Sequence, residues 1–327
     1  MFENWQLLNL LGNRNFRKLD LSVTNRCNLR CTNCGIWEIY KRDPARRKTE
    51  LTVPEYRAFF AKYGFWNQIS FTGGEPTLRP DLQQIIDAAL KECRDLHSIG
   101  INSNSSYPAR LLEVVSHTLD GGREINVHVT ISMDGPEATH DTTRGRSGNW
   151  RQSVDTYSRL KDLRHKRLAV QYHYTVSRCN AGRLRELIEC GAIDPGEVIV
   201  SFAHESYRYG PQGSSPVPDL EASKAEVAFF LSRYKVRSLK NLGQWVFLRH
   251  YQKGRRIRCV AGQNTFHMDP YGRINRCTLI DQELGSAREL LLEGETPPRD
   301  CHCYTPCESY FGIGQSRIRS LWQAIRP

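Results

Sequence analysis

The chain has 327 residues, a formal net charge of +11 and 39% hydrophobic residues. That length suits one large domain, or one large and one small domain, with enough apolar residues for a buried core. No apolar run approaches the length needed to cross a membrane, and the first residues have no basic region leading into an apolar stretch, so they do not read as a signal peptide. We therefore expect a cytoplasmic protein.

The chain contains eleven cysteines. In a long chain without a signal peptide, cysteines are more typical of metal ligands than of disulfides. Two basic clusters, at 41–48 and 253–258, agree with an anionic partner such as nucleic acid or a phosphorylated substrate, and equally with a solvated surface. No RNA-binding signature accompanies them, so nucleic acid is neither indicated nor excluded.

The first predicted strand, 19–24, leads directly into three closely spaced cysteines: Cys27, Cys31 and Cys34. Their C-x3-C-x2-C spacing lets three thiolates bind one metal cluster. A four-iron cubane held by three protein ligands keeps one iron open to another ligand. A structural zinc site built from the same residues is the alternative.

The second predicted strand, 68–72, is followed by the tetrapeptide Gly73, Gly74, Glu75 and Pro76. The chain here resembles the radical S-adenosylmethionine (SAM) enzymes, which carry both motifs at the ends of their first two barrel strands. The resemblance implies a [4Fe-4S] cluster on the three cysteines and SAM on its open iron. Asn33 stands where the family usually has an aromatic residue against the adenine. We expect Gly74→Val to keep the cluster but lose SAM, because glycines let the backbone approach the amino group of SAM.

Further strands are predicted at 98–103, 125–133, 168–176 and 198–204. Helical segments separate them, such as 80–93, where Pro80 suits the first helical turn. Strands that alternate with helices predict a parallel α/β fold. The resemblance to radical SAM enzymes implies an open, partial (β/α)6 barrel of the TIM type.

The fourth and fifth predicted strands alternate between apolar and polar residues, which is unusual for buried parallel strands. If helices cover the apolar face, the polar residues line a wet barrel interior. An antiparallel edge with a solvated polar face is the alternative. His128 and His173 share the polar parity, so we expect them to touch substrate or cofactor, with satisfied buried histidines as the alternative. Alanine at either position should then lower turnover more than stability.

The segments after the third and fourth strands resemble further cofactor-contacting segments of the family. Ser103, Asn104 and Ser105 lie where relatives approach the ribose, although a plain turn has the same composition. The string that starts at Ser132 and contains Asp134 resembles a segment whose serine and basic residue contact the methionine part of SAM. Arg144 is the basic residue here, and a guanidinium can bind a carboxylate with two parallel hydrogen bonds.

Three cysteines lie outside any metal-ligand pattern. Cys93 and Cys190 fall on or near the apolar faces of predicted helices, so we expect both in the core. Cys179 follows the fifth strand, at the carboxyl end where barrel active sites form. The resemblance to radical epimerases suggests that this thiol returns a hydrogen atom to a substrate radical.

A linker rich in Pro, Gly and Ser at 209–218 divides the chain into a core domain, 1–208, and a small α+β domain, 219–327. Asp269–Gly272 predicts a hairpin turn that brings Cys259 and Cys277 together. This string resembles the SPASM and twitch auxiliary domains, which hold extra iron-sulfur clusters. It implies a second [4Fe-4S] cluster on Cys259, Cys277, Cys303 and Cys307, with Cys301 as an alternative to Cys303 and a zinc ribbon as the other interpretation.

The resemblance implies that one electron cleaves SAM to a 5′-deoxyadenosyl radical, which abstracts hydrogen from a substrate C–H bond. Oxidation, crosslinking or epimerisation of a small polar metabolite or a peptide would follow. A flavodoxin or ferredoxin-type protein would supply the electron. The short stretch before the first strand leaves no room for a leader-peptide-binding domain, which disfavours a ribosomal peptide. The other classes still open are a zinc-stabilised nucleic-acid-binding module and a ferredoxin-like electron carrier.

Overall fold

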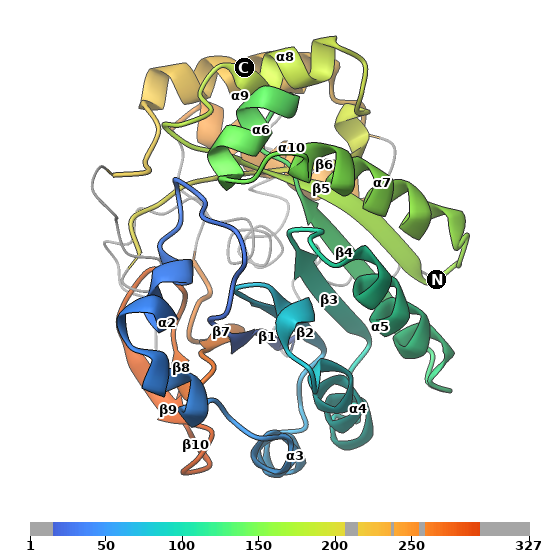
Figure 1. The fold of residues 1–327 in the computed structure, drawn as a ribbon, viewed down its shortest axis with the longest axis vertical. Helices are drawn as coiled ribbons and strands as arrows, with labels where there is room; N and C mark the ends of the chain where they lie inside the picture. Colours follow the sequence, from blue (N-terminus) through green and yellow to red (C-terminus); the bar gives the residue numbers. More distant parts are fainter. Residues whose placement is uncertain (1–15, 207–214, 237–238, 255–258, 295–327) are drawn as a thin grey trace.

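The computed structural model describes residues 16–206, 215–236, 239–254 and 259–294. Its centre is a sheet in which six consecutive strands pair in parallel (Figure 1). These strands are β1 (Lys18–Thr24), β2 (Gln68–Gly73), β3 (Ser98–Ser103), β4 (Asn126–Ser132), β5 (Leu168–Val176) and β6 (Val198–Phe202). Strand β6 is one edge of the sheet, so the barrel is partial, as predicted. The parallel pairing of β4 and β5 excludes the antiparallel alternative.

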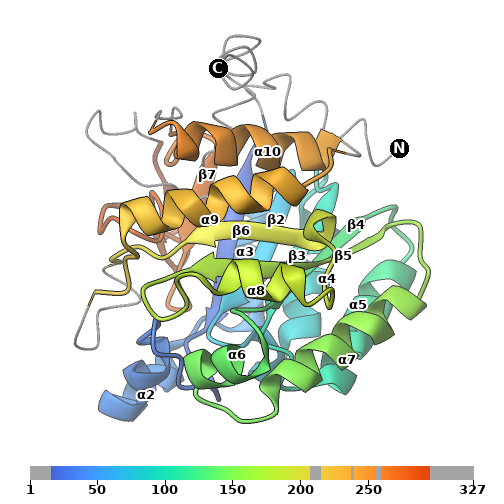
Figure 2. The same ribbon diagram turned by 90° about the horizontal axis from the view of Figure 1, so that it is seen from above.

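Helices connect the strands along the outside of the sheet (Figures 1 and 2). They are α3 (Val53–Lys62), α4 (Leu82–Glu92), α5 (Pro108–Asp120), α6 (Glu137–Arg144), α7 (Asn149–Asp162) and α8 (Arg183–Glu189). Helix α4 begins at Leu82 with Asp81 at its N-cap, so Pro80 lies in the preceding turn and not in the helix. Within the described ranges, no helix combines the length and apolar character that crossing a bilayer requires.

The strand register gives the sheet one apolar and one polar face. Leu19, Ile69, Ile99 and Val127 are paired neighbours across four strands, and all four are buried with apolar residues of α4 and α5. One position further along, Asp20, Ser70, Gly100 and His128 form the neighbouring row on the opposite face. Because successive side chains of a strand point to opposite faces, the polar face predicted from β4 and β5 continues across the sheet to β1.

The C-terminal described residues continue the same sheet. Strand β7 (Thr265–Met268) pairs in parallel with β1. It is followed by the antiparallel strands β8 (Arg273–Asn275), β9 (Glu283–Ser286) and β10 (Leu291–Leu292). The predicted turn at Asp269–Gly272 is confirmed, since the Asp269 carboxylate accepts hydrogen bonds from the backbone of Tyr271 and Arg273.

Helices α9 (Leu220–Arg233) and α10 (Leu239–Gln252) pack on each other, and α9 also packs on α8. The Gln244 side chain of α10 donates a hydrogen bond of 2.6 Å to the Val198 carbonyl of β6. Residues of the predicted second domain therefore flank and extend the barrel sheet. The domain boundaries at 208 and 219 stay a prediction, because most of the linker lies outside the described residues.

The two cysteines predicted for the core differ. Cys93 directly follows α4 and is fully buried, as predicted. Cys190 is exposed, so that prediction was wrong. Helix α8 ends at Glu189, and its 3.6-residue periodicity therefore no longer applies at Cys190.

Candidate active site at the carboxyl end of the sheet

The cysteine loop, residues 25–35, runs between the end of β1 and a short 3-10 helix, η1 (Ile36–Glu38). The segment after β2 holds one side of it. The Gly74 N–H donates to the Thr24 carbonyl at 2.7 Å, and the Glu75 N–H donates to the Arg26 carbonyl at 2.8 Å. The two motifs recognised in the sequence are therefore joined backbone to backbone.

The end of α6 holds the other side of the cysteine loop. The Arg30 N–H donates to the Arg144 carbonyl at 3.3 Å, and the Thr32 N–H donates to the Thr143 carbonyl at 2.9 Å. Gly145 follows with φ +63°, where a Cβ would lie 2.6 Å from the Arg30 carbonyl oxygen. The loop thus lies between two supports that come from different βα units.

Gly73 and Gly74 are required by the cysteine loop itself. A Cβ at Gly73 would lie 2.3 Å from the Thr24 carbonyl oxygen, and one at Gly74 would lie 2.2 Å from the Arg26 carbonyl oxygen. Real Cβ atoms do not approach backbone oxygens so closely. The expectation that Gly74→Val spares the cluster is therefore revised, because the added side chain would displace the backbone next to Cys27.

Glu75 ties the β2 loop to the β3 loop. Its buried carboxylate accepts hydrogen bonds from the Thr77 hydroxyl at 2.7 Å, the Ser103 hydroxyl at 3.0 Å and the Asn104 N–H at 2.7 Å. Burial raises the pKa of Glu75, and these donors oppose the shift. Pro76 begins the 3-10 turn that carries Thr77. Glu75 therefore fixes Ser103 and Asn104, two residues predicted to approach SAM.

Polar donors surround the three half-buried thiols. Asn104 Nδ2 lies 3.7 Å from Cys27 Sγ, and Arg144 Nη1 lies 3.9 Å from Cys31 Sγ. The Ile36 N–H bonds to the thiol of Cys34. Burial raises the pKa of Cys27 to about 11 and that of Cys34 to about 12. The positive charge of a bound metal would lower these pKa values, and the donors would stabilise the thiolates.

The residues fit an iron-sulfur cluster on this geometry. A cluster's sulfur ligands are stabilised by hydrogen bonds, and each of the three cysteines has such a donor or a cationic neighbour. Among the residues that the structure describes, no group of three His, Cys, Asp or Glu side chains is placed to hold a metal ion. A cubane takes each thiolate on a separate iron.

Arg144 and Asp134 form a buried ion pair beside the cysteines. Arg144 Nε lies 2.7 Å from Asp134 Oδ2, with the Asp134 side chain fully buried and the Arg144 side chain 14% exposed. Burial lowers the pKa of Arg144, but Asp134 and Cys31 more than compensate and raise it. The guanidinium thus stays charged and is aimed at the cluster side of the site.

Removing the Asp134 carboxylate should destabilise the fold strongly. We expect Asp134→Ala to lower the free energy of unfolding by about 3 kcal/mol, because it leaves a buried, uncompensated Arg144. Glu137→Ala is the matched control, since Glu137 pairs with Arg151 on the surface, and it should cost less than about 1 kcal/mol. Urea denaturation of both variants measures the difference, and equal losses would contradict the buried pair.

A hydrogen-bond relay that the sequence analysis missed supports these residues from behind. The Asp134 N–H donates to His140 Nδ1 at 3.1 Å, so His140 Nε2 carries the proton that bonds Asn149 Oδ1 at 3.0 Å. The Asn149 amide then donates to the Asn104 carbonyl at 3.0 Å. His140 and Asn149 are fully buried. Asn180 also donates to the Asp134 carbonyl, at 3.1 Å.

The polar face of the sheet lines the barrel interior. His128 and His173 are half-buried there, and His173 Nε2 lies 2.8 Å from Ser201 Oγ. Strands β7 and β8 add the buried His267, which bonds Ser22 at 3.1 Å, and the buried Asn275. The sequence analysis missed these two because it assigned both strands to a separate domain.

His173 should make stability depend on pH. Burial lowers the pKa of His173 to about 4, below the value of about 6.5 in unfolded chains. The unfolded state therefore binds the proton first, so this contribution is complete above pH 6.5 and is lost as the pH falls toward 4. The loss between pH 7 and pH 5 is about 2 kcal/mol. We expect His173→Gln to remove it, whereas His97→Gln, at an exposed site, should not; urea titrations at both pH values test this.

The remaining predicted residues occupy varied positions. Asn33 is half-buried in the cysteine loop, and Ser132 ends β4 opposite His173. Cys179 is exposed on the loop after β5. Cys277 is buried just beyond the end of β8, after Arg276, and Cys259 is half-buried before β7. Cys301, Cys303 and Cys307 lie outside the described residues, so the auxiliary ligand set stays a prediction.

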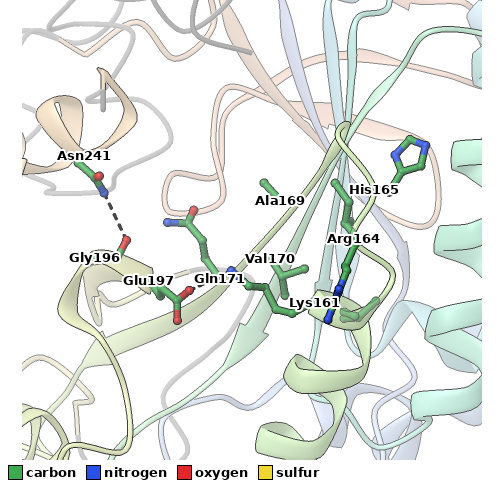
Figure 3. Close-up of a pocket in the computed structure, with 11 residues that line it drawn as sticks. Lys161, Arg164, His165, Ala169, Val170, Gln171, Gly196, Glu197 and Asn241 are labelled. Atoms are coloured by element: carbon green, nitrogen blue, oxygen red, sulfur yellow. Dashed lines mark hydrogen bonds and ion pairs between the residues drawn. The ribbon is translucent and has the colours of Figure 1, made fainter. Parts of the chain in front are cut away.

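A cavity of about 430 Å³ lies at the start of β5 (Figure 3). The end of α7, the start of β5 and α10 line it, with Lys161, Glu197 and Asn241 among its polar groups. Lys161 and Glu197 form an ion pair at 2.9 Å, and Asn241 donates to the Gly196 carbonyl at 3.3 Å. None of the residues predicted to bind SAM lines this cavity, so it is a feature separate from the site.

The fold and the site together define a class: partial α/β barrels whose strand ends present a three-cysteine cluster loop. The sequence comparison gives the family. Residues 21–181 match the model of the Radical SAM superfamily, a segment that includes the cysteine loop, the GGEP tetrapeptide and the Asp134–Arg144 pair. Residues 21–181 therefore form a Radical SAM domain, and the protein is an enzyme.

Curated proteins and solved structures resemble the chain to different extents. It is 28% identical to the sporulation killing factor maturation protein SkfB of Bacillus subtilis, over 86% of this chain and 68% of SkfB. It is 36% identical to the GTP 3′,8-cyclase of Acidothermus cellulolyticus, over 37% of this chain and 33% of the cyclase. SuiB of Streptococcus suis matches with a TM-score of 0.58 at 13% identity, over 84% of this chain and 64% of SuiB. AdoMet-bound anSMEcpe matches with a TM-score of 0.59 at 12% identity, over 94% and 98%. These structural matches show a shared fold.

Proposed function

We propose that this enzyme reductively cleaves SAM and uses the 5′-deoxyadenosyl radical to abstract hydrogen from a substrate C–H bond. Membership of the superfamily implies a [4Fe-4S] cluster and SAM. When bound, the cluster supplies the electron that cleaves SAM. The observation that carries the proposal is the cysteine loop, which is fixed between the GGEP segment and the end of α6 with donors directed at its sulfurs.

In this proposal, residues around the cysteine loop contact different parts of SAM. We assign Ser103 and Asn104 to the ribose side and Ser132 and Arg144 to the methionine side. Arg144 is already oriented by Asp134, so it can meet a carboxylate without a large loss of side-chain freedom. Asn33 takes the adenine position of the family in place of an aromatic residue. In the proposed mechanism, the protein also has to keep water away from the reacting atoms.

We propose a peptide as the substrate class, with a small polar metabolite as the second candidate. SuiB has been solved bound to the precursor peptide SuiA, anSMEcpe has been solved with bound peptides, and SkfB is a maturation protein. The polar side chains of His128, His173 and Ser201 in the barrel interior suit a substrate that carries amide or hydroxyl groups. The reaction class, whether oxidation, crosslinking or epimerisation, follows from the fate of the substrate radical, and Cys179 is the candidate hydrogen donor for epimerisation.

Anaerobic reconstitution tests the proposal. The protein should bind iron and acid-labile sulfide, and with dithionite and SAM it should produce 5′-deoxyadenosine, measured by chromatography. A zinc-stabilised nucleic-acid-binding module would contain zinc without sulfide. A ferredoxin-like carrier would contain the cluster but leave SAM intact. Either result would replace the proposed function.

A second, auxiliary [4Fe-4S] cluster is proposed on Cys259, Cys277, Cys307 and Cys303, with Cys301 as the alternative fourth ligand. We expect Cys259→Ala/Cys277→Ala to lose about half of the bound iron and to block product formation. Unproductive SAM cleavage should persist, because the cysteine loop is intact. Circular dichroism shows whether the variant is folded, since metal sites in small domains supply folding energy. A folded variant with full iron and normal turnover would rule out this cluster.

A further inference from the structure

We propose that the exposed cations on and directly after the cysteine loop form a docking surface for an acidic one-electron donor protein of the flavodoxin or ferredoxin type. We call this surface the basic rim, and it consists of Arg26, Arg30, Lys41, Arg47 and Lys48. The inference rests on the proposed function, because only a redox cluster behind the rim gives a donor protein a reason to bind there.

The charge of the segment is strongly one-sided. Residues 26–48 contain seven Lys or Arg residues and two Asp or Glu residues. Arg42 is compensated by its ion pair with Glu38, and Arg46 stacks over the Tyr271 ring at 4.6 Å. The five rim cations are exposed, and within the described ranges none of them forms an ion pair with a carboxylate. The rim therefore presents uncompensated positive charge to solvent.

The basic rim is anchored to the barrel. Glu50, just after the rim, accepts hydrogen bonds from Thr24 Oγ1 at 2.6 Å and from the Tyr40 hydroxyl, and it pairs with Arg79 at 3.2 Å. Arg79 is buried and also donates to the Val23 carbonyl at 2.7 Å. Figure 1 shows helix α2 (Ile39–Arg42) at the periphery of the molecule. The cations are thus held at a fixed place relative to the end of β1, where the cysteine loop begins.

A short path leads from the basic rim to a cluster ligand. The Trp37 ring is half-buried between two rim cations, with the Arg30 guanidinium 6.0 Å and the Lys41 ammonium 5.6 Å from its centroid. The preceding residue, Ile36, donates its N–H to the thiol of Cys34. Trp37 is therefore the sequence neighbour of Ile36, whose N–H bonds to the sulfur of Cys34, a proposed cluster ligand.

The chemistry of the partner follows from the step it performs. The donor loses one electron and the cluster gains one; no atom is transferred and no bond forms or breaks. A protein that must approach five cations and then dissociate needs an acidic face, because complementary charge accelerates encounter without requiring a large buried interface. An acidic small redox protein meets both conditions.

The test compares a rim variant with a matched charge change elsewhere. Arg47→Glu/Lys48→Glu alters the rim, and Lys91→Glu/Arg94→Glu makes the same change at exposed positions around the end of α4. Calorimetry measures the Kd of an oxidised bacterial flavodoxin and of a [2Fe-2S] ferredoxin for the reconstituted enzyme at low and at physiological ionic strength. SAM cleavage is measured with the reduced proteins and, separately, with dithionite. Lys41→Gln is the milder rim variant, and circular dichroism confirms folding.

We expect the rim variant to bind its donor at least about tenfold more weakly and to cleave SAM at the wild-type rate with dithionite. The control variant should match wild type in both assays. The proposal would be overturned if the wild-type enzyme bound neither donor, or if the rim variant and the control variant bound the donor equally tightly. The proposal would also fail if the rim variant no longer bound an acidic peptide or nucleic acid but still bound the donor as tightly as wild type. No cleavage by wild type even with dithionite would instead refute the proposed function.

Discussion

Replacing Cys27, Cys31 and Cys34 together by alanine should abolish 5′-deoxyadenosine formation while leaving the barrel folded. The three thiols are the only protein ligands proposed for the SAM-binding cluster, so the iron that would bind SAM is lost with them. The residual rate should be indistinguishable from that of SAM and dithionite without enzyme. The loop backbone keeps its hydrogen bonds to Gly74, Glu75 and α6, none of which involves a thiol.

Cys190→Ala is the control for this prediction. Its thiol is exposed at the end of α8 and has no role in the proposed site. It should retain full iron and full SAM cleavage. If the triple variant still forms 5′-deoxyadenosine at a rate near wild type, the assignment of the cysteine loop is wrong.

Gly74→Ala should lose the SAM-binding cluster, although it adds a single methyl group. That methyl would lie 2.2 Å from the Arg26 carbonyl oxygen, so the backbone next to Cys27 must move. Forcing extra atoms into such a contact costs about 1–3 kcal/mol and shifts the backbone. We expect a large fall in bound iron and in SAM cleavage, measured on the same reconstituted samples.

Gly121→Ala is the matched control. Gly121 has φ −69°, and its added Cβ would lie 3.3 Å from the nearest heavy atom, so a small adjustment accommodates it. It should retain iron and activity. If Gly74→Ala binds iron normally and loses only SAM affinity, the original expectation from the sequence is right and the backbone argument is not.

Much of this fold is visible in the sequence because local patterns specify it. The apolar parity of 125–133 predicts a face covered by helices, and the structure places Val127 and Val129 in the core. The ligand loop is equally visible, because its three cysteines are close in sequence. Cys190 shows the limit of such patterns, since periodicity does not show where a helix ends.

The supporting residues could not be predicted because their partners are distant in sequence. Asn104 is 77 residues from Cys27, and Asn149 is 45 residues from the Asn104 carbonyl that it bonds. Parity assigns a side chain to a face of the sheet, but it does not say which side chain from another strand it meets. The true partner of Gly74 is likewise a backbone oxygen on a neighbouring strand's loop, which no local pattern identifies.

The central claim is that the cysteine loop holds a cluster whose open iron binds SAM. Electron paramagnetic resonance of the dithionite-reduced Cys259→Ala/Cys277→Ala variant, with and without SAM, tests it most directly, because the second proposed cluster is then absent. We predict a [4Fe-4S]⁺ signal whose g-values change when SAM is added. A [4Fe-4S]⁺ signal that SAM leaves unchanged, or no iron-sulfur signal in a folded sample, would contradict the account.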